Sequence, residues 1–108
     1  MVESTLQLNL IFGSLSDPTR RDILRRASKK EYSIGEIASY YDMTLAAISK
    51  HLQVLEKAKL IVKKKRGKEQ LVQLSPTAFA DASTYLRQYE KLWNDRFDSL
   101  ERYLLSSK

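Results

Sequence analysis

The chain has 108 residues, of which 43% are hydrophobic and 30% charged, so we expect a single globular domain over residues 1–108. Its 19 Lys and Arg outnumber 13 Asp and Glu and give a net charge of +6, which favours an anionic partner: nucleic acid, an acidic protein or a membrane surface. There is no Cys, so the composition excludes a disulfide framework, a thiolate metal site and a Cys nucleophile.

Residues 2–15 form the first predicted helix, which carries apolar side chains, Val2 among them, on nearly all sides. In a small protein such a helix is expected to lie between its own core and another surface. The second predicted helix begins at Asp17-Pro18, because a residue before Pro is disfavoured in helical conformation and can cap the helix, and Pro suits the first helical position. Its inward stripe is Ile23, Leu24 and Ala27.

Two short helices follow, separated by residues 41–43. Ser33 and Glu36 have the spacing of a capping box at the start of the first, and Thr44 is the expected cap of the second. One face of the first helix consists of Ile34, Ile37, Ala38 and Tyr41. The predicted buried stripe of the second is Leu45, Ile48, Leu52 and Leu55. At about 100° per residue, its opposite face holds Ala46, Lys50, Gln53 and Lys57, with Ala47, Ser49 and Val54 beside it.

After Leu60 the pattern changes, and we predict a two-stranded hairpin that turns at Gly67-Lys68. Between residues 57 and 68 seven side chains are basic and none is acidic. These are Lys57, Lys59, Lys63, Lys64, Lys65, Arg66 and Lys68.

A long final helix is predicted from Pro76, with Ser75 as its cap. Its large apolar side chains recur at alternating spacings of three and four, which indicates a helix–helix seam. The seam consists of Phe79, Ala82, Leu86, Tyr89 and Trp93 and, after a break in phase at Arg96, of Phe97, Leu100 and Leu104.

Two short helices, a tight turn and a basic hairpin are the layout of a winged helix-turn-helix. We therefore predict a mainly α fold of five helices with a two-stranded wing. In this fold the second short helix lies in the major groove of DNA, where small outward residues allow close approach and long polar ones reach base edges or phosphates. The basic hairpin would follow the duplex backbone, because charges that repel one another become favourable when phosphates replace their counterions.

The predicted DNA contacts lie on the recognition helix, in the wing and at the start of the second helix. They are Thr44, Ala46, Ala47, Ser49, Lys50, His51, Gln53 and Lys57, then Lys63, Lys64, Lys65, Arg66 and Lys68, and finally Arg20. Three alternatives stay open: Lys50 can meet only phosphate, Arg20 can meet only solvent, and His51 can be a packed or backbone-bonded imidazole. The basic run itself can be a solvated face, and the tyrosines at 32, 40 and 41 are expected to pack in or around the core.

The segments FGSLSDPTRRDIL and SIGEIASYYDMTLAAISKHLQVLEKAKLI, with the hairpin after them, resemble the ArsR family of bacterial and archaeal transcriptional regulators. The most specific piece is Ser49-Lys50-His51-Leu52 followed by Val54-Leu55, which is similar to the family's S-[RK]-H-L-x-x-L pattern. The resemblance implies a dimeric repressor-type fold whose first and last helices form the dimer interface. The implied interface residues are Leu6, Leu10, Phe79, Leu86, Tyr89, Trp93 and Leu100. A ligand pocket lined by Trp93 and Tyr89 is the alternative.

The chain departs from the family pattern at several positions. Asp42 stands where the turn usually has Gly, and Asp tolerates left-handed conformation. Lys59 stands where the family usually has Gly after the recognition helix. Members often have a polar pair near Leu45-Ala46, so base specificity there is not carried over. Metal-responsive members have paired Cys in the segment matching residues 32–35, or His and carboxylates on the last helix. Neither set is present, so we expect no metal and no cofactor. The sequence does not identify an effector.

An enzyme is not expected, because the chain has one His, no Gly-rich phosphate loop and no defensible Ser–His–acid order. The main rival is a winged-helix module that binds an acidic protein partner, although the outward Lys50 and Gln53 favour groove entry. A membrane-surface protein is disfavoured, because the basic residues lie on a hairpin and not along an apolar helix. We find neither a membrane-spanning apolar run nor a secretory signal, so the expected location is the cytoplasm. The expected partners are double-stranded DNA with an inverted-repeat operator and a second copy of the chain.

Overall fold

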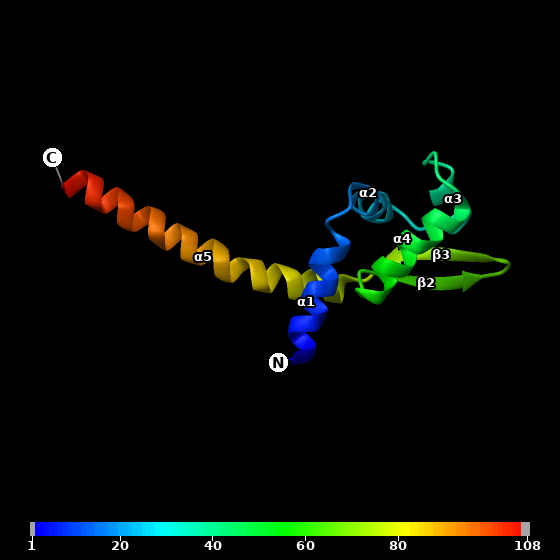
Figure 1. Ribbon diagram of the computed structural model, residues 1–108, viewed down its shortest axis with the longest axis horizontal. Coiled ribbons are helices and arrows are strands. Elements are labelled where there is room, and N and C mark those ends of the chain that lie inside the picture. Colours follow the sequence, from blue (N-terminus) through cyan, green and yellow to red (C-terminus); the bar gives the residue numbers. More distant parts are fainter. Residues whose placement is uncertain (1, 107–108) are drawn as a thin grey trace.

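The computed structural model describes residues 2–106 and, within them, the side chains of residues 5–106. The side chain of Val2, part of the predicted apolar first helix, lies outside the described residues, as do the ends of the predicted domain. The elements are α1 (Val2–Ser14), α2 (Pro18–Ala27), β1 (Tyr32–Ser33), α3 (Ile34–Ala38), α4 (Leu45–Lys57), β2 (Ile61–Arg66), β3 (Glu69–Leu74) and α5 (Pro76–Ser106). The hairpin of β2 and β3 and the far end of α5 point to opposite ends of a molecule that measures 69 × 32 × 21 Å (Figure 1).

Side-chain caps start three of the helices as the sequence predicts. The carboxylate of Asp17 accepts the backbone N–H of Arg20 at 3.0 Å, directly before Pro18. Ser33 and Glu36 form the complete capping box, and the hydroxyl of Thr44 accepts the backbone N–H of Ala47 at 3.1 Å. Each cap satisfies one of the N–H groups that a helix start leaves without an intrahelical partner.

The sheet has three strands and not the predicted two. β2 and β3 form the antiparallel hairpin, which turns at Gly67 with a positive φ of 62°. The third strand is β1, in which Tyr32 pairs with Val72 and Ser33 with Leu71, so the strand order is β1-β3-β2. A two-residue strand is too short to produce an alternating pattern, and its partners lie far along the chain. Strand β1 thus connects β3 to the start of the helix-turn-helix.

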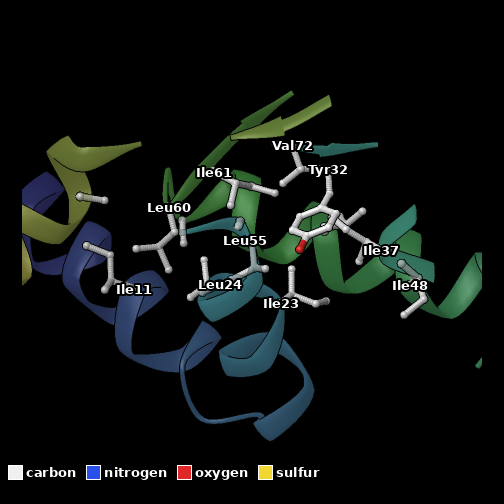
Figure 2. Packing of buried hydrophobic residues seen from close by; sticks show 14 of the residues in the cluster. Ile11, Ile23, Leu24, Tyr32, Ile37, Ile48, Leu55, Leu60, Ile61 and Val72 are labelled. Atoms are coloured by element: carbon white, nitrogen blue, oxygen red, sulfur yellow. The ribbon is translucent and has the colours of Figure 1, made fainter. Parts of the chain in front are cut away.

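A cluster of aliphatic side chains joins the helices to the sheet. In Figure 2 the side chains of Ile23, Leu24, Leu55 and Ile61 point into the space between α2, α4 and the strands. The predicted stripes of α2 and α3 are buried or partly buried, and in α4 Ile48, Leu52 and Leu55 are inaccessible to solvent. The largest fully buried aliphatic side chains are Ile11, Ile23, Ile37, Ile48, Leu52, Leu55, Leu60, Ile61 and Val72.

Leu45 contradicts its predicted place in the buried stripe, because its side chain is 58% exposed. Helical periodicity gives a residue's direction but not where the core ends. Leu45 is the first residue of α4 and lies nearly one turn before the first buried side chain of that helix, Ile48. The turn between these helices is also longer than the predicted residues 41–43, since α3 ends at Ala38 and α4 begins at Leu45.

The end of α4 is a Schellman motif built on a non-glycine residue. The N–H of Leu60 donates to the carbonyl of Leu55 at 3.0 Å, and that of Lys59 to the carbonyl of Glu56 at 2.9 Å. Lys59 has a φ of 61°, in the left-handed region that glycine usually occupies in this motif. It is the only such non-glycine residue among those described, so Asp42 does not take the left-handed conformation that the sequence suggested for the turn.

Helix α5 is continuous over 31 residues and passes Arg96 without interruption. Only its first part packs on the rest of the chain: Ala78 and Ala82 are buried, and the rings of Phe12 and Tyr85 lie 5.9 Å apart. From residue 86 to residue 106 every described side chain is exposed. At 1.5 Å per residue the helix is about 46 Å long, and more than half of it is bare.

Candidate nucleic-acid interface

None of the described elements covers the outward face of α4. Lys50, Gln53 and Lys57 are exposed, as predicted, and Ala46 is exposed beside them. Ala47 and Ser49 are half-buried and have short side chains, so the surface next to these long side chains is low. The hydroxyl of Thr44 accepts a backbone N–H in the helix cap, which leaves its hydrogen as the group available for another acceptor.

The wing carries a compact group of exposed positive charges. Among the residues that the structure describes, Lys64, Lys65, Arg66 and Lys68 take part in no ion pair, and all four are exposed. Lys63 is different: its ammonium lies 3.4 Å from the carboxylate of Glu56, and its side chain is only 18% exposed. This pair connects β2 to α4, so Lys63 positions the wing while the four residues nearer the tip remain available to an anion.

Arg20 points into the protein, which was neither of the two alternatives that the sequence left open. Its Nε donates to the carbonyl of Ser14 at 2.7 Å, and its Nη1 lies 3.3 Å from Nδ1 of His51 on α4. An Arg guanidinium only donates, so Nδ1 of His51 is the acceptor in this contact. The backbone N–H of Arg20 lowers the pKa of Asp17, whose carboxylate lies 3.9 Å from the same imidazole.

A second polar cluster joins α2 to the turn before α4. The hydroxyl of Tyr41 donates to Asp22 at 2.5 Å, Nε of Arg26 donates to the same carboxylate at 3.0 Å, and Arg25 also contacts it. The Tyr41 hydrogen bond lowers the pKa of Asp22 to about 2, while burial raises the pKa of Tyr41 to about 12. The guanidinium carbon of Arg26 lies 3.9 Å from the ring centre of Tyr40. Sequence reasoning placed these tyrosines in packing roles and missed the cluster, because no local spacing relates Asp22 to Tyr41.

The pattern of a family described as a helix-turn-helix domain matches residues 15–63. The HTH-type transcriptional regulator Rv2034 of Mycobacterium tuberculosis is 34% identical over 76 residues, which are 70% of this chain and 71% of the relative. The transcriptional repressor SdpR of Bacillus subtilis is 29% identical over 82 residues, 76% of this chain and 91% of the relative. The crystal structure of the ArsR family transcriptional regulator RHA00566 superposes with a TM-score of 0.78 at 33% identity, covering 83% of this chain and 93% of that one. The chain belongs to the ArsR family of transcriptional regulators.

Membership of this family makes the chain a DNA-binding transcriptional regulator with a winged helix-turn-helix fold, as the sequence resemblance implied. The family is not one of enzymes. Within the described residues, no three His, Asp or Glu side chains gather as they would around a metal ion. No helix in that part of the chain is long and apolar enough to cross a membrane.

The surface that the ArsR resemblance assigns to a dimer interface is bare in the single chain. Leu6 and Leu10 on α1 are exposed, and the α5 residues Leu86, Tyr89, Trp93 and Leu100 are exposed as well. Phe79 is the exception, because it packs against the chain's own core. Between α1 and α5 lies an open cavity of about 800 Å³, lined by Leu6, Leu10, Tyr85 and Gln88 among others, and neither Trp93 nor Tyr89 belongs to its lining.

Proposed function

We propose that this ArsR family member is a dimeric, sequence-specific repressor that binds an inverted-repeat operator. The observation that carries the proposal is the exposed outward face of α4. On it the long side chains of Lys50 and Gln53 lie beside the short, half-buried side chains of Ala47 and Ser49. Long polar side chains above small ones suit a helix that enters the major groove. The repressor role is supported by the similarity to SdpR, whose name describes it as a transcriptional repressor.

Dimerisation is supported by the apolar stripe of α5. The stripe begins at the buried Ala78 and Ala82 and continues through Trp93 to Leu104, on a helix that is not interrupted at Arg96. Its inner part packs in the chain's own core, while its outer part faces water over several turns. Such an extended apolar surface is typical of an interface, and a second copy offers a matching stripe under two-fold symmetry. The exposed Leu6 and Leu10 on α1 would extend the same interface.

A two-fold dimer sets the form of the operator. Two recognition helices related by a two-fold axis enter successive major grooves about 34 Å apart, so the two half-sites form an inverted repeat. The wing residues Lys64, Lys65 and Arg66 would contact phosphates, which are the same in every sequence and supply affinity without selectivity.

Titration of labelled random duplex and of a selected operator at 50 and 200 mM salt tests the proposal. If the dimer contacts about six to ten phosphates, affinity should fall by three to five decades between the two salt concentrations. A protein-binding module that uses its wing on an acidic partner would leave duplex DNA unbound even at the lower salt. Binding with a nearly flat salt response would rule out the wing as a phosphate clamp.

A further inference from the structure

The first turn of α4 exposes an apolar surface that the core does not use. Leu45 is 58% exposed, and Met43, two residues before it, is 40% exposed. Ala46 is exposed as well, and none of the three has a side-chain hydrogen-bonding group of ordinary strength. The hydroxyl of Thr44, between Met43 and Leu45, accepts the backbone N–H of Ala47 in the helix cap and keeps its hydrogen for another acceptor.

This surface lies at the end of the molecule opposite the proposed dimer helices. The side-chain amide of Gln7 on α1 donates to the carbonyl of Ala58 at 2.7 Å, which places α1 at the C-terminal end of α4. Helix α4 has 13 residues, so it is about 20 Å long and its first turn lies at the other end of the helix from Ala58 and the Gln7 contact. A second copy bound through α1 and α5 therefore leaves Leu45 uncovered.

Its surroundings favour DNA over an apolar protein partner. Lys50 is exposed and lies one turn after Ala46 on the same face of the helix, which puts a positive charge beside the Ala46 side of this surface. In helix-turn-helix proteins the N-terminal residues of the recognition helix are those that contact base edges. Within the major groove the 5-methyl group of thymine is the apolar feature that base edges present.

We propose that the first turn of α4 selects thymine in each half-site by contact of Leu45, supported by Met43 and Ala46, with the 5-methyl group. The inference rests on the proposed DNA-reading role of α4 and specifies what its first turn recognises. Side chains without donors or acceptors cannot pair with the hydrogen-bonding groups of the other bases, whereas burial of a methyl group against Leu is favourable. Burial of one methyl is worth about fourfold in affinity, so two symmetric half-sites should give roughly fifteenfold.

The experiment compares thymine with uracil, which differs from it only by the methyl group. Binding sites are first selected from random duplexes, and each thymine of the half-site is then replaced by deoxyuridine, one position at a time in both half-sites. For the unchanged protein, replacement of thymine by deoxyuridine at one or more of these positions should lower the affinity for the duplex about tenfold or more. Leu45→Ala should bring the ratio of affinities for the two duplexes below twofold at that position. Because Leu45 is exposed, its truncation leaves the core intact, which a thermal melt verifies.

Val62→Ala is the matched control. Val62 has a similar exposure, 45%, but lies on β2, and its truncation should leave the thymine-to-uracil ratio unchanged. Any of three results would overturn the inference. The selected sites could lack a constant thymine, or the affinity could be the same for every uracil duplex as for the thymine duplex. Leu45→Ala could also keep the full difference in affinity between thymine and uracil duplexes. Failure to bind any duplex would overturn the proposed function with it, whereas tight, selective binding without discrimination between thymine and uracil would overturn this inference alone.

Discussion

Arg20 and His51 are 31 residues apart in the sequence, and Nη1 of the first lies 3.3 Å from Nδ1 of the second. The same guanidinium donates through Nε to the carbonyl of Ser14, in the last turn of α1. One side chain of α2 thus connects the end of the proposed dimerisation helix to the recognition helix. The link is polar and partly buried, so its loss leaves acceptors of both helices without a partner.

Arg20→Met should lower the free energy of unfolding by about 1–3 kcal/mol, because it leaves the carbonyl of Ser14 and the imidazole of His51 without their donor. Arg21→Met is the control: Arg21 donates to the carbonyl of Leu15 at 2.8 Å, but at an exposed site where water can replace it, and its loss should have little effect. Urea unfolding of both variants measures the difference. Equal losses would show that the contact with His51 contributes nothing specific.

Tyr41→Phe should remove the strongest single support of the Asp22 cluster. The hydroxyl donates to the Asp22 carboxylate at 2.5 Å, and hydrogen bonds to a charged group contribute about 1.5–3 kcal/mol. Tyr40→Phe is a suitable control, because the ring that Arg26 stacks on is retained. Thermal melts of the two variants should differ clearly, and similar melting temperatures would contradict the role of the hydroxyl.

The same cluster should make stability depend on pH at the acid end. The folded pKa of Asp22 is about 2, below its ordinary value of 3.8, so the unfolded chain binds the proton more readily. Its stabilising contribution is therefore complete above pH 3.8 and is lost as the pH falls towards 2. Urea unfolding across this window should show stability falling with pH, and less steeply in Tyr41→Phe than in the unchanged protein. Identical slopes would mean that other carboxylates govern the acid transition.

Lys59→Gly should stabilise the protein, because a side chain with a β-carbon is strained at the φ of 61° that the Schellman motif requires. We expect a gain of about 0.5–1 kcal/mol in the free energy of unfolding, after the larger entropy of Gly in the unfolded chain is counted. Lys59→Ala separates the backbone effect from the loss of the ammonium, since Ala keeps the β-carbon. If Ala stabilises as much as Gly, charge repulsion and not backbone strain is the cause.

The dimer interface is tested by Leu86→Ala combined with Trp93→Ala. Both side chains are exposed in the single chain, so the fold should be unaffected, while each substitution occurs twice in a symmetric dimer. Burial of a large apolar side chain contributes roughly 1.5–3 kcal/mol, so the dissociation constant of the dimer should rise at least tenfold and DNA binding should weaken with it. Leu105 is exposed but lies on another side of α5, so Leu105→Ala should leave both the dissociation constant of the dimer and the affinity for DNA unchanged. Sedimentation equilibrium at micromolar concentration is the measurement, and an unchanged dimer would contradict the assigned interface.

The features predicted correctly from the sequence are those that neighbouring residues determine. The caps at Asp17, Ser33 and Thr44 follow from bonds that span three residues, and the buried stripes follow from the helical period. Leu45 was assigned wrongly because the period continues past the edge of the core. The strand β1 and the contact of Arg20 with His51 depend on segments that meet only when the chain folds. On the candidate site, the sequence identified the outward face of α4 but not the pairing of Lys63 with Glu56, for the same reason.

Substitutions on α4 and on the wing should separate selection of a sequence from general attachment to DNA. Lys50 can donate to guanine O6 or N7 and Gln53 can pair with adenine, so Lys50→Ala or Gln53→Ala should cost about 1–3 kcal/mol on the operator and much less on random duplex. Lys64 is exposed near the tip of the wing and should meet phosphate. Lys64→Ala should therefore weaken both duplexes by a similar factor and reduce the salt slope by about one for each half-site.

Paired titrations of operator and random duplex at two salt concentrations distinguish these effects for each variant. Lys63→Ala adds a useful comparison, because its ammonium is paired with Glu56 and its loss should disturb the wing's position more than the phosphate contacts. If Lys50→Ala lowers both affinities in the same proportion, then Lys50 meets only phosphate. If Gln53→Ala does so too, the outward face of α4 does not read bases, and selectivity has to come from the first turn of the helix or from the shape of the DNA.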